Sequence, residues 1–406
     1  MTDFYTHVDN YKALAIQKDY DGACAYFIEH LDKPTVMGIN EPCLMRAELL
    51  EMLFPDGVEN PTGLKNPQHD IFVLAALPIT YGLTGGYPGK AIGLYERHAA
   101  VCKQEGAMEP LAEAMGNHSK ALRQTGRFRE AEIVALQGLD LQRQVGKRMK
   151  EAVNLYWVGT GFAHRGVTTG APFEAMDRAI RIFQKLLADQ SEAVTNTFKG
   201  QSAIWFGNYD EAEGYHTRAW ELSKAREGTD FPDQQTVTKV LSASSRMLGE
   251  IEMLRGNYDK ALEWLEITEI QAARMDFGEE ILPHFRVMAE LERRRGNFDQ
   301  AREWLTKSWE RAERGPYRLY NVDSYNILAE VEDSCGNTEA AIKAAQTAYQ
   351  LAWCDGPPYA YQRGLDDAKA KIESLGGAVP TMPDYDDSKF EPVPDVLINP
   401  QDEYFD

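Results

Sequence analysis

The sequence predicts an all-α protein, a right-handed α-solenoid of stacked helical hairpins with a period of about 40 residues. Three observations predict this fold: a short signature of glycine, an aromatic residue and alanine recurs along most of the chain, its copies are evenly spaced, and small residues recur at a fixed distance before each copy. Self-similarity at a fixed period is typical of repeat architectures, in which each unit packs on its neighbours.

The signature places an aromatic residue two positions after a glycine and an alanine five positions after it. Full copies are Gly126-Phe128-Ala131, Gly207-Tyr209-Ala212, Gly256-Tyr258-Ala261 and Gly296-Phe298-Ala301, and looser copies begin at Gly86, Gly166 and Gly336. The spacing is nearly constant from one glycine to the next, except for one longer step between Gly207 and Gly256. This regularity predicts a stack of hairpins in one common register.

Each part of the signature has a local physical reason. Glycine ends the first helix because it adopts the left-handed conformation needed after the last turn. The aromatic ring fills the space between the two helices, and alanine lets the second helix approach closely. Seven positions before each glycine from Gly126 onwards stands another small residue, which permits the same close crossing: Ser119, Gly159, Gly200, Gly249, Ala289 and Ala329.

These position rules resemble those of the tetratricopeptide repeat. The usual period of that family is about 34 residues. The longer spacing here implies longer helices. The resemblance implies an α-solenoid whose first helices, one per hairpin, line a concave inner groove.

The chain divides into four parts by composition. We expect N-terminal capping helices and a loop over 1–69, the repeat array over 70–355, a capping helix over 356–377 and an extended tail over 378–406. The tail is acidic and contains several prolines. It lacks a helical period, and we expect it to fold back over the last repeat.

Four segments carry a closer resemblance: LFPDG at 53–57, AERGPY at 312–317, AWCDGPPY at 352–359 and DSKFEP at 387–392. They resemble the C-terminal tetratricopeptide region of bacterial signal-transduction ATPases of the STAND class, with NACHT or NB-ARC cores. In those proteins this region is the sensor. The phosphate-binding loop GxxxxGK[ST] of such an ATPase is missing here, because Gly89-Lys90-Ala91 has the wrong spacing and lacks the hydroxyl. Both a free-standing relative of the sensor and a piece of a longer protein remain open.

Composition bounds the partners. Lys and Arg total 43 against 63 Asp and Glu, a net charge of −20, which disfavours nucleic acid. The longest apolar run, 71–83, is shorter than a membrane span and contains Pro78. Five scattered cysteines, no signal peptide and no metal-ligand spacing indicate a reduced, cytoplasmic protein without a metal or cofactor.

Projecting the repeat register places certain positions of each first helix in the inner groove, where we expect a ligand. These candidate residues are Asn117, Lys120, Arg123, Tyr156, Thr160, Thr197, Gln201, Arg246, Glu250, Arg286, Glu290, Arg293, Asn326 and Glu330. Lys120 and Arg123 make one end basic, and Glu330 makes the other acidic. An extended peptide fits such a groove.

Structural explanations compete with these assignments. Arg246 with Glu250, and Arg286 with Glu290, are spaced as i,i+4 pairs that stabilise a helix by about 0.2–0.5 kcal/mol without any ligand. The tryptophans, Trp205 among them, and His164 are expected to pack within hairpins. Cys354 is a candidate reactive thiol, but no histidine base is indicated beside it.

Three classes of function follow. The favoured hypothesis is a non-catalytic protein- or peptide-binding scaffold or sensor of a bacterial signalling or defence system, with a separately encoded ATPase or effector as a candidate partner. The second is a receptor for a small molecule or signalling peptide, as in tetratricopeptide quorum-sensing regulators. The third is an enzyme or protease cofactor with an unrecognised site, for which the sequence offers no catalytic motif.

Overall fold

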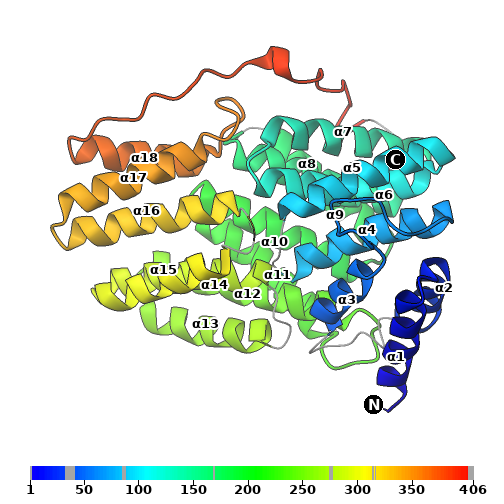
Figure 1. The fold of residues 1–406 in the computed structure, drawn as a ribbon. Helices are drawn as coiled ribbons and strands as arrows, with labels where there is room; N and C mark the ends of the chain where they lie inside the picture. Colours follow the sequence, from blue (N-terminus) through cyan, green and yellow to red (C-terminus); the bar gives the residue numbers. More distant parts are fainter. Residues whose placement is uncertain are drawn as a thin grey trace.

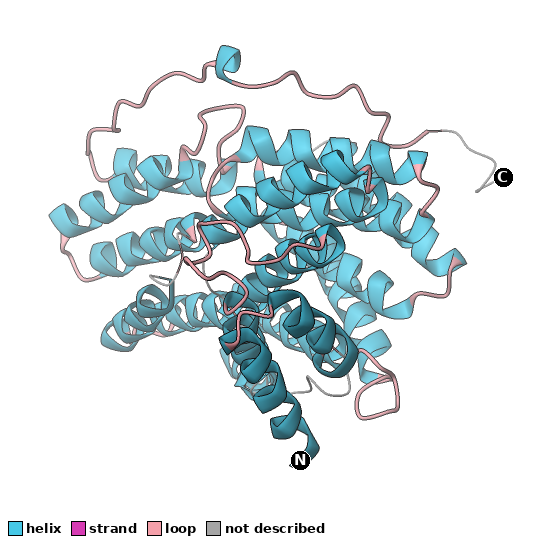
Figure 2. Cartoon of the chain, turned by 45° about the vertical axis from the view of Figure 1, so that its right-hand side comes forward, coloured by secondary structure: helices cyan, strands magenta, loops and turns pink. Residues whose placement is uncertain are grey.

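A computed structural model describes residues 2–32, 42–84, 88–167, 170–273, 278–312, 315 and 317–400 (Figure 1). Across these residues the regular elements are all helices, joined by loops and turns (Figure 2). The chain forms a right-handed α-solenoid of the tetratricopeptide type, as the period predicted.

A small N-terminal group of helices precedes the array. It consists of α1 (Thr2–Ile16), α2 (Tyr20–Tyr26) with its one-turn π-helical extension η1 (Phe27–Leu31), and α3 (Pro42–Glu51). Their apolar faces pack with α4 in one cluster, in which Tyr11, Phe27 and Leu50 are fully buried.

Within the described residues, seven hairpins and one last helix follow in chain order. They are α4 (Pro67–Leu83) with α5 (Pro88–Glu105), α6 (Met108–Gln124) with α7 (Phe128–Gln144), α8 (Arg148–His164) with α9 (Ala171–Lys185), α10 (Asp189–Trp205) with α11 (Tyr209–Lys224), α12 (Gln234–Leu254) with α13 (Tyr258–Ala273), α14 (Gly278–Arg294) with α15 (Phe298–Ala312), α16 (Arg318–Ser334) with α17 (Thr338–Ala352), and α18 (Gln362–Ser374). We call the first helix of each hairpin its A helix and the second its B helix. The one long glycine spacing has two sources: α12 has 21 residues where the other A helices have 17, and the connection from α11 to α12 (225–233) is longer than those between the other hairpins.

The predicted role of the signature glycines is confirmed at six of the seven positions. At the α6–α7 turn Gly126 has φ +87°, its N–H donates to the Arg123 carbonyl at 3.0 Å, and the Arg127 N–H donates to the Leu122 carbonyl at 2.9 Å. This pair of bonds is the Schellman arrangement that satisfies the last carbonyls of a helix. The turns at Gly166, Gly207, Gly256, Gly296 and Gly336 repeat it. Gly86 and Tyr87 lie outside the described residues.

The small residues of the repeat allow A and B helices to cross closely. A Cβ on Gly200 would lie 2.5 Å from the buried His216 ring of the B helix, and one on Gly249 would lie 3.1 Å from the Ala261 carbonyl oxygen. Ser119 uses the same closeness differently, since its hydroxyl donates to the Ala131 carbonyl at 2.7 Å. Side chains of ordinary size do not fit at these crossings.

The array curves until the turn of its second hairpin meets the loop that follows its last hairpin. The α6–α7 turn (126–129) contacts the loop after α17 (353–361), and we call this contact the seam. The Arg129 backbone N–H donates to Asp355 Oδ2 at 2.9 Å, and its guanidinium donates to the Tyr359 hydroxyl at 2.8 Å. Arg165 of the next turn donates to the Pro358 carbonyl at 2.9 Å. The helices α4 and α14 also touch across the ring.

The C-terminal segment crosses from one end of the array to the other (Figure 1). It starts on the last hairpin as expected, where Trp353 Nε1 donates to the Pro383 carbonyl at 3.0 Å. It then leaves that hairpin, and Val393, Val396 and Ile398 pack on the apolar cluster of α7, α8 and α9. Arg143 and Arg178 donate to the carbonyls of Ile398 and Pro400, both at 3.1 Å.

The expectation that the tail folds back over the last repeat is therefore wrong for its second half. The physical reason is that an extended segment keeps its carbonyls free, and these need hydrogen-bond donors when buried. The arginines of α7 and α9 supply them. The segment 401–406 lies outside the described part of the chain.

Replacing Arg129 by Met tests the seam. Arg129 is 5% exposed and also contacts Asp387, with 2.9 Å between Nη2 and Oδ1. We expect a loss of about 1–3 kcal/mol of unfolding free energy, because buried acceptors lose their donor. We also expect faster tryptic cleavage after Lys389. Urea unfolding and limited proteolysis measure both.

The matched control is Arg127→Met, on the same turn. Arg127 pairs with Glu130 and Glu96 at the surface, so its loss is expected to cost at most about 1 kcal/mol. Equal effects of the two substitutions would contradict a closing role for Arg129.

Candidate functional site

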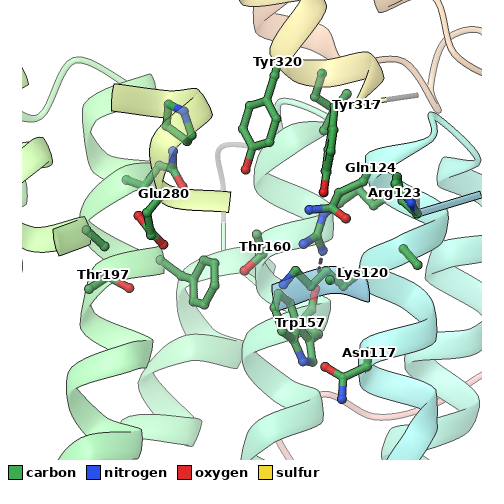
Figure 3. A pocket seen from close by; sticks show the side chains of 18 of the residues that line it. Asn117, Lys120, Arg123, Gln124, Trp157, Thr160, Thr197, Glu280, Tyr317 and Tyr320 are labelled. Atoms are coloured by element: carbon green, nitrogen blue, oxygen red, sulfur yellow. Dashed lines mark hydrogen bonds between the residues drawn. The ribbon is translucent and has the colours of Figure 1, made fainter. Parts of the chain in front are cut away.

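The A helices enclose a cavity of about 320 Å³ on the inner side of the ring. Side chains from α6, α8, α10, α14 and α16 point into one space, with Arg123 and Lys120 facing Glu280 across Thr160 (Figure 3). Nine predicted groove residues line this cavity: Asn117, Lys120, Arg123, Tyr156, Thr160, Thr197, Gln201, Arg246 and Arg286. We call it the central cavity.

A second, more open hollow of about 580 Å³ lies beside it, towards the last hairpins. Its lining contains the remaining predicted residues and shares Arg286: Glu250, Glu290, Arg293, Asn326 and Glu330. All fourteen predicted positions thus lie on the inner surface, divided between two hollows. Their role in binding stays a prediction.

Charged residues of the second hollow form ion pairs between neighbouring helices. Arg286 Nη2 lies 2.9 Å from Glu250 Oε2 of the preceding A helix, and its Nε lies 3.8 Å from Asp323 Oδ2 of the following one. Lys371 of α18 pairs with Glu330 at 2.9 Å. Burial favours the neutral form of Glu250, but the charges of arginines, Arg286 first, outweigh it and hold the pKa of Glu250 below its usual range.

The structural explanation by i,i+4 pairs needs correction for Arg286, which reaches across to Glu250 and Asp323 of the neighbouring hairpins. Glu290 does pair within its own helix, but with Arg293 and Arg294. The pair across hairpins was not expected because sequence spacing carries no information about the adjacent helix. The acidic end of the groove is also compensated, since α18 brings Lys371 to it.

Aromatic rings form the floor of the central cavity. Tyr156 stacks on Phe198 with 5.4 Å between ring centroids, and Trp157 lies 5.2 Å from the same ring. Lys120 and Arg123 lie over Trp157, at 5.6 and 5.3 Å from its centroid. The floor thus combines apolar surface with positive charge.

The C-terminal loop completes the wall. Tyr361 lies against His164 and Trp205, with ring centroids 5.7 and 6.4 Å away, and its hydroxyl donates to Asp323 at 3.0 Å. The ring centroids of His164 and Trp205 are 4.5 Å apart. We expected both to be hairpin packing, and the structure places both on the cavity wall.

The repeat register could also have identified the cavity residues that were not predicted. Apart from Asn117, the predicted residues stand ten, six or three positions before the signature glycine of their hairpin. Positions nine and two share that helix face, because residues three, four and seven apart lie on one stripe. Besides Asn117, position nine holds Trp157, Phe198 and Met247, and position two holds Gln124, His164 and Trp205, all of which line the central cavity.

His164 is a neutral group at the wall. Burial, aided by the charge of Arg123, lowers its pKa to about 3. Its Nδ1 lies 2.8 Å from the Thr160 carbonyl oxygen, which can only accept, so Nδ1 carries the proton and Nε2 is an acceptor. This arrangement suits hydrogen bonding more than proton transfer at neutral pH.

Within the described residues no three His, Cys, Asp or Glu side chains gather as metal ligands, and none of the helices combines the length and hydropathy that spanning a bilayer requires. Burial raises the pKa of Cys354 to about 12, so this thiol stays protonated at neutral pH. It lies at the seam, against Gly126.

A solenoid of such hairpins, with A helices around an inner hollow, is the architecture of tetratricopeptide repeat proteins. The family model described as tetratricopeptide repeat matches residues 284–305. No curated protein sequence matches the chain.

Solved structures match over nearly the whole chain. A Rap protein complexed with competence and sporulation factor has a TM-score of 0.56 at 16% identity, covering 92% of this chain and 99% of that one. The Rap conjugation gene regulator of plasmid pLS20, in complex with the Phr peptide, has a TM-score of 0.50 at 14% identity, covering 92% and 96%. A STAND protein with a tetratricopeptide repeat sensor from Pyrococcus horikoshii has a TM-score of 0.38 at 13% identity, covering 91% of this chain and 55% of that one. At these identities the likeness to the two Rap proteins shows the fold alone.

Buried neutral histidines predict a loss of stability in mild acid. Burial lowers the pKa of His98 and His284 to about 4 and that of His216 to about 3. Below the unfolded value of about 6.5 the unfolded chain binds protons that the folded chain does not. Their contribution is therefore complete above that pH and falls as the pH drops towards the folded values.

We expect up to about 2 kcal/mol of lost stability per histidine between pH about 7.5 and about 5, measured by urea unfolding. His284→Phe is the matched variant, since neither ring nitrogen of His284 has a hydrogen-bond partner among the described residues. It should lose less stability over the same range. A stability that is flat or rises towards pH about 5 would rule out this account.

Proposed function

We propose that the chain is a non-catalytic sensor module that holds a short, extended peptide in the central cavity. The observation that carries this proposal is that successive A helices turn the same helix positions towards one enclosed space of about 320 Å³. Pockets for small ligands span about 300–1,000 Å³ and combine apolar surface with a few polar groups. The lining has this composition.

The polar lining suits a peptide backbone. Side-chain amides and hydroxyls come from several A helices: Asn117, Gln124, Thr160, Thr197 and Gln201. Amides donate and accept at once, so they pair with both groups of a peptide unit. Between them the rings of Tyr156, Trp157 and Phe198 offer surface for apolar side chains of the peptide.

The size of the cavity favours a peptide over a folded protein surface. The two Rap proteins of similar fold were solved with a competence and sporulation factor and with the Phr peptide. Their likeness to this chain adds support for the class of ligand. The same proposal includes a role in bacterial signalling or antiviral defence and a cytoplasmic location. It also includes a separately encoded ATPase or effector as second partner.

Affinity selection from a pool of random hexapeptides tests the function. The protein is mixed with the pool and separated by gel filtration, and the retained peptides are quantified by mass spectrometry. We expect retention by the wild-type chain and at least about tenfold less by Thr197→Trp, because the indole occupies the cavity.

Thr306→Trp is the matched control. Both threonine hydroxyls donate to a carbonyl of their own helix, at 2.7 Å for Thr197 and 2.9 Å for Thr306, but Thr306 is exposed on α15. Retention by Thr306→Trp should equal wild type. Failure of the wild-type chain to retain any peptide, or equal loss in both variants, would refute the proposed function.

A further inference from the structure

The wall of the central cavity carries the opposite charge to the rest of the protein. Among its described lining residues, five side chains are basic (Lys120, Arg123, Lys239, Arg246 and Arg286) and two are acidic (Glu280 and Asp323). The whole chain has the reverse balance, with 43 basic against 63 acidic residues. A basic lining in an acidic protein indicates a site for an anionic group.

The basic side chains of the cavity come mainly from two helices, α12 and α6. Lys239 and Arg246 lie seven positions apart on α12, so they share one face with about 10 Å between them along the axis. Thr160 lies between Glu280 on one side and Lys120 and Arg123 of α6 on the other (Figure 3). The basic groups thus belong to two walls of one space.

Arg246 is buried and has few hydrogen-bond acceptors. Its side chain is 5% exposed, and its Nε has no hydrogen-bond acceptor among the described residues. Its Nη2 lies 3.7 Å from Glu280 Oε2, which is longer than a hydrogen bond, and its Nη1 reaches only the Met247 sulfur at 3.5 Å. The charges of Glu280 and Glu250 act on this guanidinium, but its N–H groups have few hydrogen-bond acceptors among the described residues. Buried donors without acceptors are costly unless a ligand supplies them.

Both acidic residues of the described lining lie beside arginines. Asp323 lies 3.8 Å from Arg286 and accepts a hydrogen bond from Tyr361. Glu280 stands beside Arg246 itself. Among the described lining residues the basic side chains still outnumber the acidic ones.

We infer that the central cavity recognises an acidic peptide, whose carboxylate accepts hydrogen bonds from Arg246 and lies in the field of Lys239. This inference rests on the proposed function and specifies its ligand. A carboxylate matches a guanidinium because two oxygens accept from two parallel N–H groups. Long polyanions are disfavoured, since the enclosed cavity does not admit them and the net charge of −20 repels them.

Charge-defined hexapeptide pools test this ligand class. Three pools share random positions and differ at two fixed positions, which hold Asp or Glu, Asn or Gln, or Lys. Each pool is made with a free C-terminus and as the C-terminal amide, which separates a side-chain carboxylate from a terminal one. Retention is measured as above with the wild-type chain.

We expect the acidic pool to be retained at least about tenfold more than the basic pool. Equal or better retention of the neutral or basic pool overturns the inference and leaves the proposed function standing. Retention of no pool overturns both. If the amide form of the acidic pool is retained as well as the free acid, the carboxylate is a side chain; if only free acids are retained, it is the C-terminus.

Variants then locate the anchor. Arg246→Gln should weaken retention of the acidic pool by about 30-fold or more, and retention of the neutral pool much less. Lys239→Gln, which leaves the Arg246–Glu280 contact in place, should act in the same direction. It decides the question if Arg246→Gln fails to fold. Arg226→Gln is the control, because Arg226 pairs with Asp189 on the exposed surface. An unchanged preference in a folded Arg246→Gln protein and in Lys239→Gln contradicts the assignment.

Discussion

The seam between the α6–α7 turn and the loop after α17 is the contact on which the inner surface depends. There the chain joins segments that are far apart in the sequence, through Arg129 with Asp355 and Tyr359. Arg165 adds a guanidinium 3.9 Å from the centre of the Tyr359 ring. Burial raises the pKa of Asp355, and the backbone N–H groups of Arg129 and Phe128 work against that rise. We expect loss of this contact to open the superhelix and to leave its A helices along a shallower groove.

Closure gives the A helices a common interior and ties that interior to the chain's C-terminal segment. Tyr361 belongs to the seam loop, yet its ring touches His164 and Trp205 and its hydroxyl binds Asp323. The extended segment 378–400 then spans from the last hairpin to α7–α9 and ties the two ends together. Any ligand-dependent change at the central cavity therefore has a short physical route to the seam and the tail. The same closure places basic side chains of α6 and α12 around one space.

Sequence reasoning predicted what local physics determines. The six signature glycines within the described residues ended their helices in the left-handed conformation, and the fourteen projected positions line the two hollows, because both depend on spacing along one helix. It did not predict the closure, since curvature sums small angles between hairpins that no local pattern encodes. The cross-hairpin pair of Arg286 with Glu250 and the path of the tail depend on that curvature too. Trp157 and Phe198 were not predicted for a simpler reason. Both stand nine positions before a signature glycine, and the prediction included only Asn117 from that row of the inner helix face.

The most direct measurement is a crystal structure of the full chain with a peptide recovered from the acidic pool. Our account predicts an extended peptide inside the ring, its carboxylate on Arg246 and its backbone between Thr197 and Gln201, with the seam closed. A peptide bound on the outer B helices, or a ring open at Arg129 and Tyr359, would contradict it.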